Sequence, residues 1–313
     1  MARKFDSETT AREVVEDLDL SGWSALVTGA SGGLGAETAA ALAGRGARVT
    51  LAARDVDRAA GVVAEIRTEN PDAELDVVKL ELDSPQGVID CAQQVLARHD
   101  RLDALINNAG VMACPLARTA QGFELQFATN HLGHFLLTSR LLPLLRAAST
   151  ARVVNLSSGG HRMSPVVFDD IHFERRDYDK WESYGQSKSA NVLFSVELDA
   201  RHEVEGLRSF AVHPGAIVTD LGRHLAQEDL VALNARSPGG KLSFKSPGAG
   251  AATSTWAATA PELAGRGGLY LEDCGIAEVS EEGPGGVNPW ALDPEAARRL
   301  FEVSEKMLGE RFA

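Results

Sequence analysis

The sequence predicts an α/β protein with a doubly wound, Rossmann-type parallel sheet, covered by helices on both faces. Short apolar runs with the length of buried strands alternate with helical patterns along most of the 313 residues. A glycine-rich turn separates the first such strand from the first long helix. No internal repeat and no linker divides the chain, so residues 1–313 are expected to form a single domain in three layers.

The predicted elements follow one another at regular spacing. The expected strands are Trp23–Val27, Arg48–Ala52, Leu75–Leu80, Ala104–Ile106, Arg152–Leu156, Ser209–Val212 and Gly268–Leu271. The expected helices are Thr9–Leu18, Ala36–Arg45, Val56–Thr68, Pro85–Arg98, Phe123–Arg146, Tyr184–His202, Ala249–Ala260 and Asp293–Arg311. Strands joined through helices of this length form right-handed crossovers, and such crossovers build a parallel sheet.

Four segments fall outside this alternation. Residues 1–20 form an extension ahead of the first strand, and residues 275–286, rich in glycine and acidic residues, are expected to be loose within a C-terminal tail and helix, 275–313. Residues 159–180 and 221–246 each follow the C-terminal end of a strand. Ligands bind at that edge of a doubly wound sheet, so we expect these two segments to form walls or a lid. Surface loops without a function are the alternative.

The composition limits the classes of partner and compartment. A net charge of −13 argues against binding to nucleic acid or to an anionic membrane surface. The N-terminal residues carry many charges and no apolar core, so neither a signal peptide nor a membrane anchor is expected. The three cysteines, Cys91, Cys114 and Cys274, lack the spacing of a metal site or a disulfide framework. A cytoplasmic protein is the simplest expectation.

The first strand runs into a turn with the pattern TGxxxGxG, from Thr28 to Gly35. Gly29, Gly33 and Gly35 leave out side chains where a pyrophosphate approaches the backbone, and the following helix N-terminus favours an anion. The GxxxxGK[ST] phosphate loop is excluded because no lysine follows these glycines, and GxGxxG is excluded because Thr38 stands at its last glycine. A glycine turn without a ligand is the alternative.

A second constellation surrounds Tyr184 and Lys188, which are four residues apart and therefore share one face of a helix. A neighbouring ammonium stabilises a phenolate and lowers its pKa from an ordinary value of ~10. Other polar phrases stand at strand ends or within a helix: Asn107-Asn108-Ala109-Gly110, Asn130, Ser157-Ser158 and His213-Pro214-Gly215, leading to Thr219.

In this order the motifs resemble the short-chain dehydrogenase/reductase family, over roughly residues 23–219. The phrases around Asn130-His131 and Ser187-Lys188 and the long insert before Tyr184 are most similar to the retinol dehydrogenase and WW-domain oxidoreductase branch. The resemblance implies a twisted seven-stranded parallel sheet with a nicotinamide cofactor across its carboxyl edge.

The resemblance also assigns roles. Tyr184 would be the general acid/base, Lys188 would bind the cofactor ribose and lower the tyrosine pKa, and Ser158 would stabilise the developing oxyanion. Asn130 would hold a water that links Lys188 to solvent; a helix cap or kink is its alternative role. Ser157 is the alternative hydroxyl.

Other reactive side chains receive structural interpretations. His131 and His134 are three apart, but without a third ligand nearby we expect packing or surface roles and no metal. Cys114 is expected to be a small buried apolar residue, with a place beside the substrate as the alternative.

The end of the second strand favours NADP over NAD. An NAD-type enzyme places an acid where Ala53 stands, whereas Arg54 follows and suits a 2′-phosphate; Asp55 is the alternative, NAD-type ligand. Glu81-Leu82 replaces the family's Asp-Leu at the adenine. Further contacts implied by the resemblance come from Ser31, Leu34, Asn107, Ala109, Gly110, Pro214, Gly215, Ile217 and Thr219.

Taken together, we expect an NADP-dependent oxidoreductase that interconverts a carbonyl and an alcohol on a small apolar substrate. A protochlorophyllide-reductase-like double-bond reductase and a non-catalytic dinucleotide-binding sensor or scaffold are the alternatives. The resemblance implies a homodimer or a homotetramer, with the Phe123–Arg146 and Tyr184–His202 helices as the interface.

Overall fold

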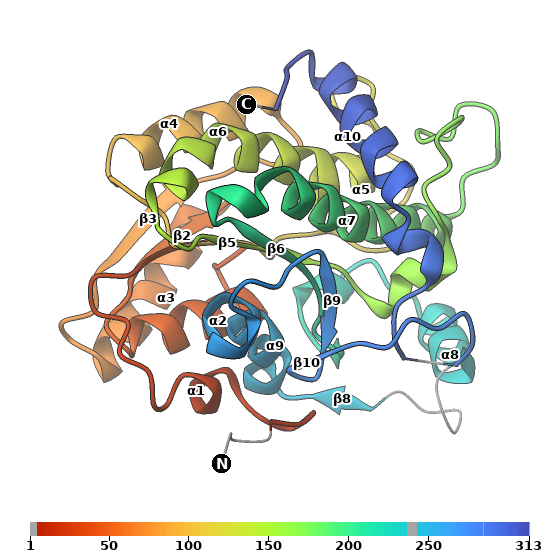
Figure 1. The fold of residues 1–313 in the computed structure, drawn as a ribbon. Coiled ribbons are helices and arrows are strands. Elements are labelled where there is room, and N and C mark those ends of the chain that lie inside the picture. The colour runs from red at the N-terminus through yellow and green to blue at the C-terminus, as the bar shows by residue number, and fades with distance from the viewer. Residues whose placement is uncertain (1–4, 237–242, 284, 313) are drawn as a thin grey trace.

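The computed structural model describes residues 5–236, 243–283 and 285–312, and its core is an eight-stranded sheet in the order β10-β9-β6-β5-β4-β1-β2-β3 (Figure 1). All seven expected strands are present and pair in parallel. Their bounds are β1 Ser24–Thr28, β2 Arg48–Ala53, β3 Leu75–Lys79, β4 Ala104–Asn107, β5 Arg152–Leu156, β6 Arg208–His213 and β9 Leu269–Glu272. The eighth strand, β10 (Gly275–Ile276), was not expected and pairs antiparallel with β9.

The strand order reverses at β1: β2 and β3 are added on one side of it, and β4 lies on the other side. From β1 the chain steps outward through β2 to β3, then returns to place β4 against the other side of β1. Val27 lies opposite Leu51 on one side and Ile106 on the other, and every residue of β1 is buried. In a doubly wound sheet, ligands bind at this switch point, outside the carboxyl ends of the strands.

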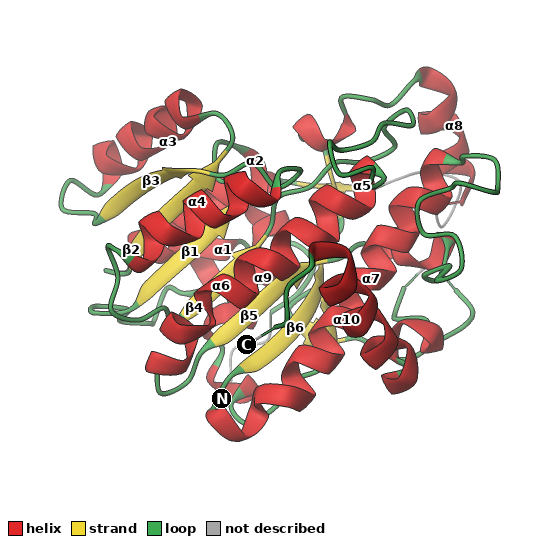
Figure 2. Cartoon of the chain, turned by 90° about the horizontal axis from the view of Figure 1, so that it is seen from above, coloured by secondary structure: helices red, strands yellow, loops and turns green. Residues whose placement is uncertain are grey.

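Two layers of helices cover the sheet (Figures 1 and 2). One layer contains α4 (Pro85–Leu96), α5 (Leu125–Phe127), α6 (Gly133–Ala147) and α7 (Lys180–His202), with α10 (Pro294–Leu308) packed outside α7. The other contains α1 (Ala11–Val14), α2 (Gly33–Ala43), α3 (Val56–Glu69) and α9 (Pro247–Thr259). Each layer encloses its own apolar core against one face of the sheet. This is the three-layer arrangement that the sequence predicts.

Helix α10 closes the first core with aromatic side chains. The ring of Phe301 lies 4.8 Å from that of Phe135 on α6 and 5.7 Å from that of Phe194 on α7. Phe312, beyond the end of α10, adds a ring 4.9 Å from Phe301. The outer side of α6 and α7 near these rings is therefore covered by the chain's own C-terminal helix.

Two expected helices differ from the structure. The helix expected over Thr9–Leu18 is a single turn, α1, because acidic residues follow it where the helix dipole disfavours negative charge. The helix expected over Phe123–Arg146 is divided: a π-helical turn, Ala128–Leu132, separates α5 from α6. A π-turn inserts one residue, which hydrophobic periodicity does not reveal.

The less regular segments also contain structure that the sequence did not predict. Within 221–246 lie α8 (Gln227–Arg236) and β8 (Phe244–Lys245), which pairs with β7 (Ala216–Ile217); residues 237–242 are outside the described residues. The described part of 275–286, which is expected to be loose, makes contacts that the sequence did not predict. Val279 bridges Val287, and the Arg162 guanidinium donates to the carbonyls of Ser280 and Gly285.

Candidate active site

A glycine turn joins β1 to α2 and is packed directly against the end of β4. Gly29 has a φ of +67°, and a Cβ there would lie 2.9 Å from Ala109 Cα. A Cβ on Gly35 would lie 2.6 Å from the Gly29 carbonyl oxygen. The Thr28 hydroxyl accepts the main-chain N–H groups of Asn108 and Ala109, each at 2.9 Å. Close packing of two backbone turns therefore explains why these positions are glycine.

The same turn leaves the N-terminus of α2 open to an anion. The helix begins at Gly33, earlier than expected, and its N-cap, Gly32, supplies no side-chain hydrogen bond to the first turn. Main-chain N–H groups at such an end are free to bind phosphate oxygens, and the helix dipole adds to the attraction. Ser31, in the turn, and Leu34, in the first helical turn, flank this end.

Residues of the Pro214–Thr219 loop lie beside this turn, although the sequence separates them by more than 180 positions. A Cβ on Gly33 would lie 3.4 Å from Thr219 Cγ2. Leu34 and Ile217 both approach the same point, since a Cβ on Gly250 would be 2.7 Å from Leu34 Cδ2 and 2.6 Å from Ile217 Cγ1. The structure thus brings together two of the predicted groups of cofactor contacts.

The loop itself is held from the substrate side. Gly215 has a φ of +93°, and the aliphatic part of Lys245 lies 2.9 Å from where its Cβ would stand. Lys245 also forms an ion pair with Asp273 in the turn between β9 and β10. Pro214 precedes Gly215 at the carboxyl end of β6.

Two charged residues follow β2, and the structure gives them different environments. Arg54 is exposed at the carboxyl edge of the sheet. The Asp55 carboxylate instead accepts the Arg58 N–H at 3.0 Å and caps α3. Sequence reasoning missed Arg58, whose guanidinium lies 3.4 Å from a Cβ position on Gly32 and 2.9 Å from the Asp220 carboxylate. The sequence places Arg58 four residues after Arg54, but Arg54 precedes the N-cap of α3, so helical spacing does not relate the two.

Two of the expected cofactor residues place their side chains away from the open edge. Asn107 is buried and donates to Asn155 Oδ1 at 2.8 Å and to Thr138 Oγ1 at 3.1 Å, so its side chain belongs to the core. Leu82 is buried in the apolar core, while its neighbour Glu81 forms an ion pair with Lys79 at 3.0 Å. The sheet edge therefore receives only the main chain of Asn107.

The hydroxyl-bearing side chains meet at the end of β5. Tyr184 is 3% exposed, and its ring packs on the turn that carries Ser158: a Cβ on Gly160 would lie 2.7 Å from Tyr184 Cε1 and 3.3 Å from Ser158 Oγ. Ser158 Oγ accepts the Gly160 N–H at 3.0 Å. By contrast, Ser157 Oγ donates to the Lys188 carbonyl at 2.9 Å. Of the two serines, Ser158 is therefore the one beside the phenol.

Burial governs the protonation of the pair on α7. It raises the pKa of Tyr184 to about 12, and an interaction with Ser158 offsets part of the rise. It lowers the pKa of Lys188 to about 8. Lys188 Nζ lies 5.6 Å from the tyrosine ring centre and donates to the Leu156 carbonyl at 2.9 Å. The direction of the Tyr184 shift is opposite to the depressed pKa that the sequence predicts, and desolvation is its largest cause.

Asn130 lies in the π-helical turn and joins three elements around this pair. Its side-chain amide donates to the Val111 carbonyl and to Ser187 Oγ, both at 2.9 Å, and its Oδ1 accepts the Val111 N–H at 2.8 Å. A Cβ on Gly110 would lie 3.1 Å from Asn130 Oδ1 and 3.7 Å from Lys188 Nζ. Asn130 is thus close to Lys188, with Gly110 between them.

The remaining candidates are buried. His131 lies among aromatic rings and hydrogen-bonds Ser304, and His134 hydrogen-bonds Thr28. Cys114 is 2% exposed, and its carbonyl accepts the Tyr178 hydroxyl. Among the described residues, no three histidine, cysteine, aspartate or glutamate side chains are arranged to hold a metal ion.

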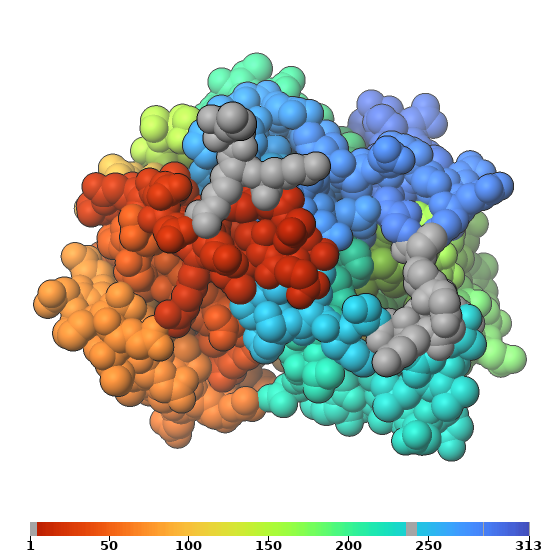
Figure 3. Space-filling model, turned by 90° about the horizontal axis from the view of Figure 1, so that it is seen from below, coloured from red at the N-terminus to blue at the C-terminus, as the bar shows by residue number. Residues whose placement is uncertain are grey.

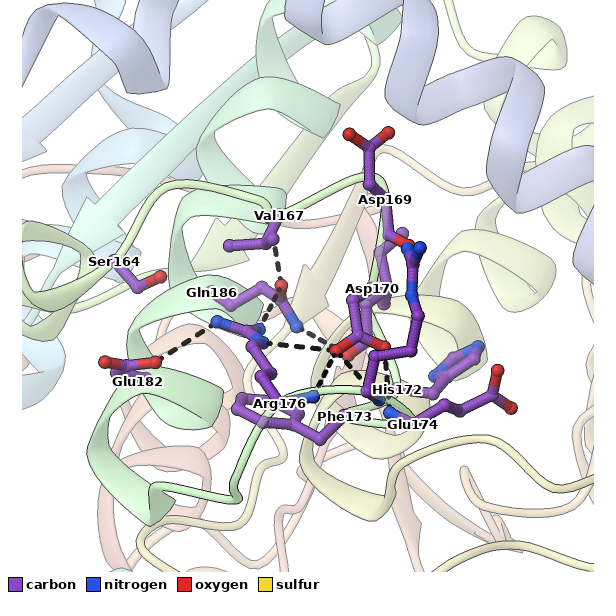
Figure 4. Close-up of polar contacts among 12 residues, drawn as sticks. Ser164, Val167, Asp169, Asp170, His172, Phe173, Glu174, Arg176, Glu182 and Gln186 are labelled. Carbon is purple, nitrogen blue, oxygen red and sulfur yellow. Dashed lines mark hydrogen bonds and ion pairs between the residues drawn. The ribbon is translucent and has the colours of Figure 1, made fainter.

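Hydrogen bonds hold the 159–180 insert together and attach it to α7 (Figure 4). The Asp170 carboxylate accepts the N–H groups of Glu174 and Arg176 at 2.8 and 3.0 Å. From α7, Gln186 accepts the Val167 N–H at 3.0 Å and donates to the Ile171 carbonyl at 2.8 Å. The insert is therefore attached to the helix that carries Tyr184, one half-turn from that residue.

The described part of the 221–246 segment is joined to α7 by an ion pair. Lys180, at the start of α7, forms an ion pair with Asp229 of α8 at 2.6 Å. In the space-filling view from below, this segment lies beside the C-terminal part of the molecule and next to the N-terminal half (Figure 3). Its described apolar side chains include two that are more than half exposed, Val231 and Phe244.

Comparisons with known proteins agree with this arrangement. The family model described as short chain dehydrogenase matches residues 24–230. A Penicillium rubens protein named short-chain dehydrogenase/reductase prx1 is 40% identical over 97% of this chain and 91% of its own length. Human retinol dehydrogenase 13 is 39% identical over 93% of this chain and 86% of its own length.

Solved structures show the same fold. A Mycobacterium paratuberculosis protein is 32% identical, with a TM-score of 0.75 over 98% of this chain and 99% of its own. The Pseudomonas aeruginosa RhlG/NADP active-site complex is 28% identical, with a TM-score of 0.64 over 81% and 95% of the two chains. In the described parts of this chain, no helix combines the length and apolar character needed to cross a bilayer.

Proposed function

The chain belongs to the short-chain dehydrogenase/reductase family, and from this premise we propose that it uses NADP(H) to interconvert an aldehyde or ketone and the corresponding alcohol. Family membership makes it an NAD(P)-dependent oxidoreductase. The observation that carries the finer proposal is the buried contact of Tyr184 with the Ser158 turn, one helical turn from Lys188.

The residues around this contact would each have a separate role in binding the substrate oxygen. The substrate oxygen would lie between the Tyr184 phenol and the Ser158 hydroxyl, which would both donate hydrogen bonds as negative charge develops on that oxygen. The Gly160 N–H already occupies one lone pair of Ser158 Oγ, and this polarises the hydroxyl as a donor. When bound, the nicotinamide would supply or accept the hydride.

In the reductive direction, Tyr184 would donate the proton to the substrate oxygen. Because burial holds its pKa at about 12, the phenol is protonated at neutral pH and is ready to donate. Lys188 would return a proton to the phenolate that remains after donation. Asn130 lies close to the Lys188 ammonium, with Gly110 between them. Tyr184 would thus act as the general acid, with Lys188 and Asn130 as its proton supply.

The open glycine cradle fits the pyrophosphate of a dinucleotide, with α2 uncapped and Gly33 and Thr219 side by side. At the adenosine end of the cofactor, NADP is proposed rather than NAD because of the charged side chains there. Arg54 is exposed at the strand end, and Arg58, which is paired with Asp220, lies near Gly32, whereas the Asp55 carboxylate caps α3. Guanidinium groups favour the 2′-phosphate of NADP.

The substrate would be apolar and of moderate size. Val218 in the loop after β7, Phe244 on β8 and Leu116 after the β4 turn are large apolar side chains with exposed fractions of 75%, 52% and 46%. Human retinol dehydrogenase 13, a relative, is named for an apolar alcohol. In the described parts of 159–180 and 221–246, we find no feature that selects a retinoid.

Cofactor titration followed by turnover tests the proposal. The purified protein is titrated with NADPH and with NADH, and binding is followed by cofactor fluorescence. Tighter NADPH binding that Arg54→Ala weakens would support the cofactor site; preference for NADH would refute it. A panel of apolar aldehydes, ketones and conjugated alkenes then assigns the reaction, since turnover of alkenes alone would indicate a double-bond reductase.

Tyr184→Phe provides the catalytic control. We expect it to retain NADPH binding and to lose carbonyl reduction, because only the hydroxyl is removed. Cofactor binding in the wild type without turnover of any substrate in the panel would instead favour a sensor or scaffold.

A further inference from the structure

His134 is completely enclosed between the glycine turn and Asn130, and the site described above assigns it no role. It is 2% exposed. Its Nε2 lies 2.9 Å from Thr28 Oγ1, and its Nδ1 lies 3.0 Å from the Asn130 carbonyl oxygen. His134 therefore contacts Thr28, at the end of the strand that leads into the cofactor cradle, and Asn130, which lies close to Lys188 in space.

Donor counting fixes which ring nitrogen carries the proton. The Thr28 hydroxyl accepts two main-chain N–H groups, from Asn108 and Ala109, and these fill both lone pairs of its oxygen. Its own proton is then available only for donation, and the acceptor is His134 Nε2. The proton of the neutral ring consequently resides on Nδ1 and is donated to the Asn130 carbonyl.

Beyond Asn130 the same direction of donation continues to the catalytic helix. The Asn130 amide donates to Ser187 Oγ at 2.9 Å, and Ser187 Oγ donates to the Tyr184 carbonyl at 2.8 Å. Four hydrogen bonds thus link Thr28 through His134, Asn130 and Ser187 to the Tyr184 main chain; the link passes through Asn130 itself, from its carbonyl to its side-chain amide. We refer to this set as the Thr28–Tyr184 chain.

The π-helical turn makes this path possible. The Gly133 N–H reaches back five residues to the Ala128 carbonyl, so the helix is widened where Asn130 lies. The widened turn brings the Asn130 carbonyl within reach of the His134 ring, one turn later in the same segment. Burial keeps the ring neutral by lowering its pKa to about 4, and the Lys188 charge acts in the same direction.

We propose that His134 is a positioning residue that fixes Asn130 and, through Ser187, the segment of α7 that carries Tyr184 relative to the cofactor cradle. The proposal rests on the proposed function above, in which Tyr184 is the general acid. It assigns His134 an effect on kcat, with little effect on cofactor binding, because the ring touches the supporting hydrogen bonds and not the cofactor cradle's open face.

His131 offers a matched control for substitution. It lies three residues earlier and is equally buried; its ring makes one hydrogen bond, to Ser304 on α10, where the His134 ring makes two. His134→Leu should lower kcat for NADPH-dependent reduction of an apolar aldehyde such as octanal about tenfold, the factor expected for one buried hydrogen bond. His131→Leu should destabilise the fold to a similar extent and leave kcat unchanged.

Two further measurements separate positioning from general loss of stability. His134→Asn, whose amide can donate to the Asn130 carbonyl, should recover part of kcat. In a double-mutant cycle, His134→Leu and Ser187→Ala should be non-additive because they interrupt one chain, whereas His131→Leu and Ser187→Ala should be additive. Additive effects of His134 and Ser187, or equal kcat losses in the two histidine variants, would overturn the proposal.

A readout without turnover keeps this inference distinct from the proposed function. ¹⁵N NMR of histidine-labelled protein should show His134 protonated at Nδ1 and unprotonated at Nε2, and Thr28→Val should change that signal. The double-mutant cycle can be repeated on the free energy of unfolding in urea. An Nε2–H tautomer would overturn the Thr28–Tyr184 chain, whereas absence of carbonyl turnover in the wild type would overturn only the proposed function.

Discussion

A single methyl group on Gly160 should separate catalysis from cofactor binding. An alanine Cβ there would lie 2.7 Å from Tyr184 Cε1 and 3.0 Å from Cδ1. Carbon atoms in contact are normally ~3.5–4.0 Å apart, so the phenol ring would have to move by about 1 Å. Misplacement of a catalytic group by that distance costs about 100-fold in rate. We therefore expect Gly160→Ala to lower kcat about 100-fold.

The neighbouring glycine is the control. A Cβ on Gly159 would meet only the His213 ring, at ordinary contact distances of 3.5 Å to Nε2 and 3.7 Å to Cε1. Gly159→Ala should therefore retain kcat, and both variants should bind NADPH as the wild type does, because the cradle is untouched. Initial rates at saturating NADPH and octanal, with fluorescence titration, provide the comparison. Wild-type kcat in Gly160→Ala, or equal losses in both variants, would refute the reasoning.

Three other predictions follow from the charged groups. Arg54→Ala should weaken NADPH binding about 10- to 100-fold, because charge-assisted hydrogen bonds are lost; fluorescence titration measures this. Asp55→Ala should leave the NADPH preference intact. It should lower the free energy of unfolding in urea by about 1 kcal/mol, the typical contribution of a helix cap. Burial lowers the pKa of Lys188 from 10.5 to about 8, so between these pH values the unfolded chain binds more protons than the folded chain. The free energy of unfolding of the wild type should therefore rise with pH in this range relative to Lys188→Met. A difference between the two proteins that does not change with pH would contradict this. Asp170→Ala removes the acceptor of two main-chain N–H groups, so limited proteolysis should cut the 159–180 insert faster, and unchanged cleavage would show that the carboxylate does not hold this insert.

The sequence predicted the sheet and the positions of the motifs because both depend on local signals. Buried parallel strands are continuous apolar runs, and all seven lie within a residue or so of their expected bounds. Tyr184 and Lys188 share a helix face by spacing alone, and Ser158 follows a strand end. The structure adds to this the distinction between Ser157 and Ser158, which depends on the direction in which each hydroxyl points.

Other features depend on contacts between distant segments. Asn107 was expected at the cofactor, but it faces inward because it pairs with Asn155 in the neighbouring strand. Asp55 could have been recognised as a helix cap, since an aspartate directly before α3 is a common start signal. No pattern in the sequence indicates that His134 reaches Thr28, more than 100 residues earlier, or that a π-turn brings it to Asn130.

The covering of α6 and α7 by α10 has a consequence for biosynthesis. The rings of Phe135 and Phe194 emerge from the ribosome 166 and 107 residues before Phe301, which packs against both of them. During that interval the nascent chain presents an uncovered aromatic surface, and partly folded chains with such surfaces are prone to aggregate. Substitutions that weaken the docking of α10 should therefore reduce the yield of soluble protein more than they reduce the activity of the molecules that fold.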